Sequence, residues 1–442
     1  MVKMTFPKII ESYLNVSRGF YRSSDMELIY RNYIHKGVYD FISENLLSKI
    51  QVLYLFSQKK TPEAISTKDS VYLLYDQYCG QFLNMCNRLF LYETSDIGSH
   101  VYFSKIVAEE LRPHDNSLLY IFFLLQYKDN RNIIHELNGR NLHKNYTAVQ
   151  ENYCLFHELY HAISLLKPNL CISYIEQASH FLNQHFNSDK HIDPLYMRNH
   201  LQFQDRFYAD EPTSISQIEE MNQLFDRGKN TLLSNSEQLH ILKDEIAADI
   251  FALENSFEIS LKLYHTKPND SKIIDNRHSY AWEQFISFYI GFLHFRALEL
   301  FRASLQDLYC NKDELFISFS VQRAMVRTTI IEEIICQYLT EYVHPDVWQH
   351  SYPKALIPIL QQTHGVSEFS LVKMSLIKRH DEFVAHRLIN IVNLIRNPDA
   401  VIYEEAELLI KHLQRKSSKK LDLIHLADAL WMQLNSPLIS RS

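Results

Sequence analysis

The sequence predicts a mainly α-helical protein with a small β-sheet in its core and helical regions on both sides of that core. Only 8 of the 442 residues are glycine, which argues against a β-sandwich with a turn about every ten residues. Hydrophobic residues make up 46% of the chain, which excludes a disordered polypeptide. Apolar residues also recur with helical spacing in the two segments that carry the candidate site.

The charge balance narrows the possible partners. The chain carries 45 Lys and Arg against 52 Asp and Glu, a formal charge of −7, which argues against a surface dedicated to nucleic acid or anionic membranes. No uncharged apolar run approaches the roughly 18 residues that a membrane helix needs. Residues 1–20 do not resemble a secretory signal, and the cysteines form no C-x-x-C pair. We therefore expect a cytoplasmic protein with no membrane span and no nucleic-acid partner.

We expect three consecutive regions along the chain. They are a helical N-terminal region at 1–99, a core at 100–350 that holds the candidate site, and a helical C-terminal region at 351–442. No Pro-, Ser- or Gly-rich linker separates them, so the limits follow from the position of the motifs and from typical domain lengths.

Local patterns suggest the elements of the first region and the start of the second. Residues 1–56 indicate aromatic-rich helices, the polar stretch 57–70 is a plausible break, and residues 71–92 have helical spacing. Residues 118–127 form an apolar run of strand length. That run is equally compatible with a buried helical segment, because periodicity does not distinguish the two at this length.

Residues 157–161 read His-Glu-Leu-Tyr-His, and their surroundings predict a helix over 147–167. Thr147 begins a capping-box pattern, and Pro168 follows the last predicted residue. Histidines four positions apart project from one face of a helix, so both imidazoles of this motif can reach one zinc ion.

The motif also supplies a base. Glu158 lies between His157 and His161, where it can take a proton from a metal-bound water. The alternative interpretation is an ordinary amphipathic helix with two hydrogen-bonded histidines and a surface carboxylate.

A second helix, predicted at 235–263, offers a third ligand. Its Asp-Glu-Ile-Ala-Ala-Asp segment places Glu245 and Asp249 one turn apart on one face, and Ser234 begins a capping-box pattern. A catalytic zinc site needs three protein ligands and a free position for water. Glu245 is the candidate third ligand, and a carboxylate one turn later can accept the remaining N–H of a ligand histidine. The alternative for both residues is a solvated acidic stripe.

These two motifs resemble the HExxH…ExxxD pattern of the gluzincin zinc metallopeptidases. The resemblance implies a zincin-like core in which His157, His161 and Glu245 bind Zn²⁺ and Glu158 is the general base. It also implies that Asp249 orients a ligand histidine, His157 in our interpretation.

Two further histidines are similar to one that stabilises the oxyanion in many relatives. His344 begins a His-Pro-x-x-aromatic sequence, and His278 has similar spacing to an aromatic residue without the proline. The order HExxH, ExxxD and His-Pro also resembles, more weakly, the Lit-type phage-exclusion peptidases. Either histidine could hydrogen-bond the oxyanion, and packing or surface roles are the alternatives.

The sequence thus predicts an enzyme that hydrolyses peptide bonds of a protein or peptide substrate with zinc-activated water. Because the regions outside the motifs are large, a regulated host-defence or toxin-like protease is one form of this prediction. The alternative is a zinc-binding scaffold or interaction protein whose HExxH site is structural. The sequence does not indicate an oligomeric state.

Overall fold

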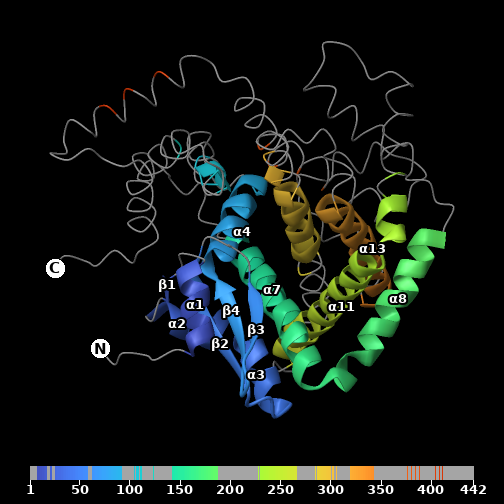
Figure 1. Ribbon diagram of the computed structural model, residues 1–442, viewed down its shortest axis with the longest axis horizontal. Helices are drawn as coiled ribbons and strands as arrows, with labels where there is room; N and C mark the ends of the chain where they lie inside the picture. Colours follow the sequence, from blue (N-terminus) through green and yellow to red (C-terminus); the bar gives the residue numbers. More distant parts are fainter. Residues whose placement is uncertain are drawn as a thin grey trace. The chain divides into compact units, whose positions relative to one another are not determined.

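The computed structural model (Figure 1) describes most of the helices and the sheet around the candidate site. The described stretches are 7–16, 20–21, 25–57, 62–91, 142–187, 229–265, 286–299 and 319–342, together with isolated positions as far as Lys411. Within these residues, no helix is both long enough and apolar enough to cross a membrane.

The chain divides into two compact units, each assembled from three separate stretches. The first unit comprises Met1–Asn84, Lys144–Arg296 and Phe316–Asp381, and it contains the sheet and both motif helices. The second comprises Met85–His143, Ala297–Leu315 and Glu382–Ser442, and within it Arg302 forms an ion pair of 2.8 Å with Glu110. The three consecutive regions expected from the sequence stay a prediction.

The N-terminal part of the first unit combines short helices with a small sheet. Its elements are α1 (Lys8–Val16), β1 (Phe20–Tyr21), α2 (Asp25–Ile29), the π-helix η1 (Tyr30–Ile34), α3 (Lys36–Glu44), β2 (Ile50–Phe56), β3 (Glu63–Ser66), β4 (Val71–Asp76) and the first part of α4 (Gln77–Phe90), which continues into the second unit from Met85. The strand order is β1-β2-β4-β3, with β2 and β4 parallel and the two outer pairings antiparallel.

Side chains that alternate along β2 and β4 cover both faces of the sheet. On one face, Ile10 and Tyr13 of α1 pack in a core cluster with Leu53, Leu55, Tyr72 and Leu74. On the other face, the hydroxyl of Tyr75 contacts Glu151 of the long helix α7 (Leu142–Leu166). Since successive strand residues point to opposite faces, α1 and α7 cover opposite sides of the sheet.

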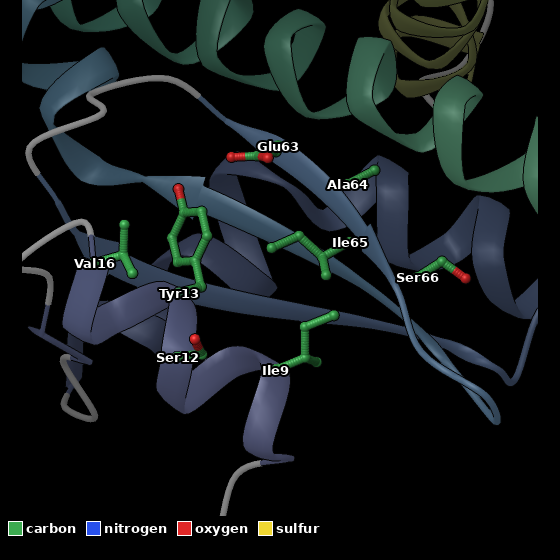
Figure 2. Close-up of a pocket in the computed structure, with 8 residues that line it drawn as sticks. All are labelled: Ile9, Ser12, Tyr13, Val16, Glu63, Ala64, Ile65 and Ser66. Carbon is green, nitrogen blue, oxygen red and sulfur yellow. The ribbon is translucent and has the colours of Figure 1, made fainter.

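A pocket of about 460 Å³ lies between α1 and β3, with side chains such as Ile9, Val16 and Ile65 around it (Figure 2). Ile65 pairs with Tyr72, which belongs to the face that α1 covers. The pocket is therefore on the α1 side of the sheet, and α7 covers the other side.

Long helices complete the first unit. They are α7 (Leu142–Leu166), α8 (Ile172–Asn187), which follows the short 3-10 turn η3 (Pro168–Cys171), α11 (Ser236–His265) and α13 (Phe319–Tyr342). In this packing α11 lies against both α8 and α13. The predicted class, mainly α with a small sheet, is confirmed.

Two expectations for the N-terminal region were wrong. Residues 50–56 form strand β2 within a region expected to be helical, and residues 71–76 form strand β4 before α4 begins. All six residues of β4 are buried, and the first five form a continuous apolar run without the alternation of a half-exposed strand. Pairing with a partner outside the local sequence decided its conformation.

The helix starts also differ in detail. The predicted cap Thr147 is buried inside α7, which begins at Leu142, whereas the predicted end before Pro168 is confirmed. On α11, Asn235 rather than Ser234 is the cap, because its Oδ1 accepts the backbone N–H of Gln238 at 3.1 Å. Phe123 is helical, and the rest of the apolar run at 118–127 and almost all of the region 351–442 lie outside the described residues.

Candidate metal centre

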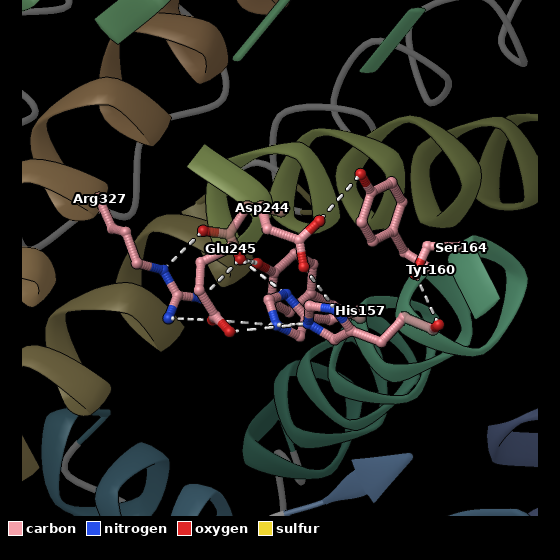
Figure 3. A network of polar contacts seen from close by, with 9 residues as sticks. His157, Tyr160, Ser164, Asp244, Glu245 and Arg327 are labelled. Carbon is pink, nitrogen blue, oxygen red and sulfur yellow. Dashed lines mark hydrogen bonds and ion pairs between the residues drawn. The ribbon is translucent and has the colours of Figure 1, made fainter. Parts of the chain in front are cut away.

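Helices α7 and α11 bring His157, His161 and Glu245 together. One ligand atom from each residue lies within 4.8 Å of the others, and this group could bind a metal ion. Figure 3 shows His157 of α7 facing Asp244 and Glu245 of α11. No other group of three or more such side chains occurs among the residues that the structure describes.

Two of the three distances within the group match the edge of a tetrahedral site, and the third is slightly longer. The Nε2 atoms of His157 and His161 are 3.4 Å apart. Glu245 Oε2 lies 3.4 Å from Nε2 of His157, and Oε1 lies 3.7 Å from Nε2 of His161. Two ligand atoms at 2.0–2.1 Å from one tetrahedral ion are about 3.4 Å apart. Two imidazoles and a carboxylate therefore fit Zn²⁺, and other divalent transition metals accept the same ligands.

Each histidine has a carboxylate of α11 beside its second ring nitrogen. Nδ1 of His157 is 2.8 Å from Oδ1 of Asp249, and Nδ1 of His161 is 3.2 Å from Oδ2 of Asp244. These contacts direct both Nε2 atoms toward the centre of the group. Asp249 was singled out from the sequence, whereas the contact of Asp244 with His161 was not foreseen. In the sequence, the only indication of a role for Asp244 was that it directly precedes Glu245.

Helix α13 adds a residue that sequence reasoning missed. Arg327 contacts both motif carboxylates, with Nη1 2.8 Å from Oε2 of Glu245 and Nη2 2.7 Å from Oδ1 of Asp249. Its Nε also donates to Oδ2 of Asp249 at 2.9 Å. No signal in the sequence singled it out, because α13 carries other charged residues, among them Arg323 and Glu332.

The electrostatic environment favours charged carboxylates at the centre. Burial by itself raises the pKa of Glu245 and Asp249, but Arg327 and His157 outweigh it and hold both pKa values below their ordinary range. Burial lowers the pKa of His157, and contacts with Asp249 and Glu245 outweigh that effect and raise it to about 10. Glu245 and Asp249 are therefore ionised, and a metal ion that binds His157 would displace the proton from its Nε2.

Glu158 follows His157 directly on α7. Burial raises its pKa above the ordinary value of a glutamate, with Glu245 acting in the same direction and His157 and His161 opposing it. A carboxylate whose pKa is raised is a stronger proton acceptor than one in water.

The helix that carries the histidines is anchored to the sheet by Glu151. Its Oε1 accepts hydrogen bonds from Tyr75 of β4 at 2.8 Å and from Tyr30 of η1 at 3.0 Å. A Cβ at Gly80 of α4 would lie 1.8 Å from the same oxygen, so a larger residue there would displace the Glu151 carboxylate. These contacts hold α7 where its histidines meet α11.

The two histidines considered for the oxyanion, His344 and His278, lie outside the described residues. Comparisons with family models, with curated proteins and with solved structures find no match for this chain. The assignment of the centre therefore depends on the geometry of its own residues.

Proposed function

We propose that this protein is a zinc-dependent metallopeptidase that hydrolyses peptide bonds of a protein or peptide substrate. The observation that carries the proposal is the convergence of His157, His161 and Glu245, with Glu158 on the same helix as the histidines. The resemblance to gluzincins on these residues agrees with it.

In the proposed hydrolysis, the zinc ion and the protein side chains would have different roles. A bound Zn²⁺ would polarise the scissile carbonyl and lower the pKa of a water molecule. Glu158 would accept the proton of that water and donate it to the leaving amine. Asp249 and Asp244 would keep the Nδ1–H tautomers of His157 and His161, so that both Nε2 atoms stay available as ligands.

The geometry favours a catalytic centre over a structural one. Structural zinc sites are usually closed by four protein ligands, whereas only three groups converge here among the described residues. The side chains of His161 and Glu245 are 21% and 30% exposed, so solvent reaches the group. A water molecule therefore has access to it. The regulated host-defence or toxin-like form of the enzyme stays a prediction from the size of the flanking regions.

The experiment compares the zinc-loaded wild type with Glu158→Gln on a mixture of unstructured peptides, with cleavage followed by mass spectrometry. We expect wild-type cleavage that a chelator abolishes, and a variant that keeps its zinc and its circular dichroism but does not cleave. A wild type that binds zinc tightly, cleaves nothing and unfolds when zinc is removed would instead indicate the scaffold alternative.

A further inference from the structure

All three guanidinium nitrogens of Arg327 contact carboxylates at the metal centre. Nη1 contacts Glu245, while Nε and Nη2 contact the two oxygens of Asp249. The planar fork of arginine can bridge two carboxylates in this way, and a lysine cannot. The side chain of Asp249 is fully buried, and that of Glu245 is 30% exposed.

The packing of α13 directs the side chain of Arg327 toward α11. The buried residues Val326, Ile330 and Ile334 belong to the same helix. One turn before Arg327, Arg323 also reaches α11, where its Nη1 donates to Oε1 of Gln238 at 2.5 Å. Two arginines four positions apart therefore contact α11, and the second, Arg327, contacts Glu245 and Asp249 (Figure 3).

We propose that Arg327 is a positioning residue that holds one oxygen of Glu245 away from the metal ion, so that Glu245 binds through its other oxygen alone. This inference rests on the metal centre of the proposed function. Arg327 contacts Oε2, whereas Oε1 is the oxygen that lies 3.7 Å from Nε2 of His161. With one oxygen and two imidazoles bound, a fourth position stays open for water.

The same contacts fix the partner of His157. Arg327 holds both oxygens of Asp249, and Oδ1 of Asp249 lies beside Nδ1 of His157. Without the arginine, two carboxylates one turn apart on α11 would repel each other, and the buried one would lose its cation. Both Glu245 and Asp249 would then move or take up a proton.

Charge and positioning make opposite predictions for the removal of Arg327. A cation beside a divalent metal repels it, so charge alone predicts tighter metal binding in Arg327→Met. Loss of a residue that orients ligands weakens metal binding by about 10–100-fold in comparable sites. The sign of the change therefore distinguishes the two effects.

The test uses Co²⁺ as a spectroscopic probe in the full-length protein. We measure the Kd for Co²⁺ by competition with a chelator and record the visible d–d absorption of the loaded protein. In Arg327→Met we expect a Kd raised about 10-fold or more, and a weaker band, because a bidentate Glu245 raises the coordination number. Arg323→Met is the matched control and should leave both the Kd and the band unchanged.

Arg327→Lys keeps the positive charge but removes the planar guanidinium group that bridges Glu245 and Asp249. This variant tests the inference if Arg327→Met does not fold. We expect it to raise the Kd and to weaken the band as well. Unchanged or tighter binding with an unchanged band, in a folded Arg327 variant, overturns the inference and leaves the proposed function standing. Failure of the wild type to bind Co²⁺ or Zn²⁺ overturns both.

Discussion

Asp249 of α11 lies against His157 of α7, with Oδ1 of the aspartate 2.8 Å from Nδ1 of the histidine. The aspartate is fully buried and also accepts hydrogen bonds from Tyr153 of α7 and from Arg327 of α13. Three helices therefore meet at one carboxylate. Because that carboxylate is held on several sides, the ring of His157 is fixed with Nε2 toward Glu245.

Asp249→Asn should keep the fold and weaken zinc binding by about 10–100-fold. The amide can still contact the ring N–H of His157, but it lacks the charge that strengthens the imidazole as a ligand. Zinc affinity is measured by competition with a chelator. Asp40→Asn, at an exposed ion pair with Lys36, is the control and should bind zinc as the wild type does. An Asp249→Asn affinity equal to that of the wild type would remove Asp249 from the centre.

Asp244→Asn should weaken zinc binding by less than Asp249→Asn. The Asp244 contact with His161 is longer, at 3.2 Å, and the aspartate side chain is 37% exposed, so water screens the pair. The same chelator competition measures it. A larger loss than in Asp249→Asn would mean that His161, rather than His157, depends most on its carboxylate.

The purified protein should contain about one zinc per chain, and His161→Ala and Glu245→Ala should lose most of it. Each of these variants removes one of three ligands, and two remaining ligands bind zinc weakly. Elemental analysis after dialysis measures the metal content. His180→Ala on α8 is the control, since this exposed histidine pairs with Gln184 away from the centre. Full metal content in both ligand variants would contradict the assignment.

Glu151→Gln should remove a pH dependence from the stability of the fold. Burial raises the pKa of Glu151 to about 7 from an ordinary 4.5, against hydrogen bonds from Tyr75 and Tyr30 that lower it. The folded chain thus holds this proton more tightly than the unfolded chain. The resulting stabilisation is complete below pH 4.5 and is lost as the pH rises through 7, on the order of 3 kcal/mol.

The measurement is the free energy of unfolding in urea at several pH values between 4.5 and 8. Glutamine keeps an acceptor for both tyrosine hydroxyls and does not titrate, so the variant should gain stability relative to the wild type as the pH rises. Parallel curves for the two proteins would show that Glu151 does not titrate in this range.

The sequence by itself determined the mainly helical class and both motif helices. Helical periodicity and local stop signals are short-range properties, so Pro168 marked the end of α7 and the spacing of His157 and His161 placed both on one face. The candidate ligands were also visible, because residue type and i, i+4 spacing are written in the chain.

Only the tertiary structure decided the strands and the surroundings of the ligands. The buried segment β4 is a strand because it pairs with β2, and its apolar residues alone do not distinguish a strand from a buried helix. Likewise, the contacts of Asp244 with His161 and of Arg327 with Glu245 join residues far apart in sequence. Such contacts depend on how α7, α11 and α13 pack, and no local pattern encodes that packing.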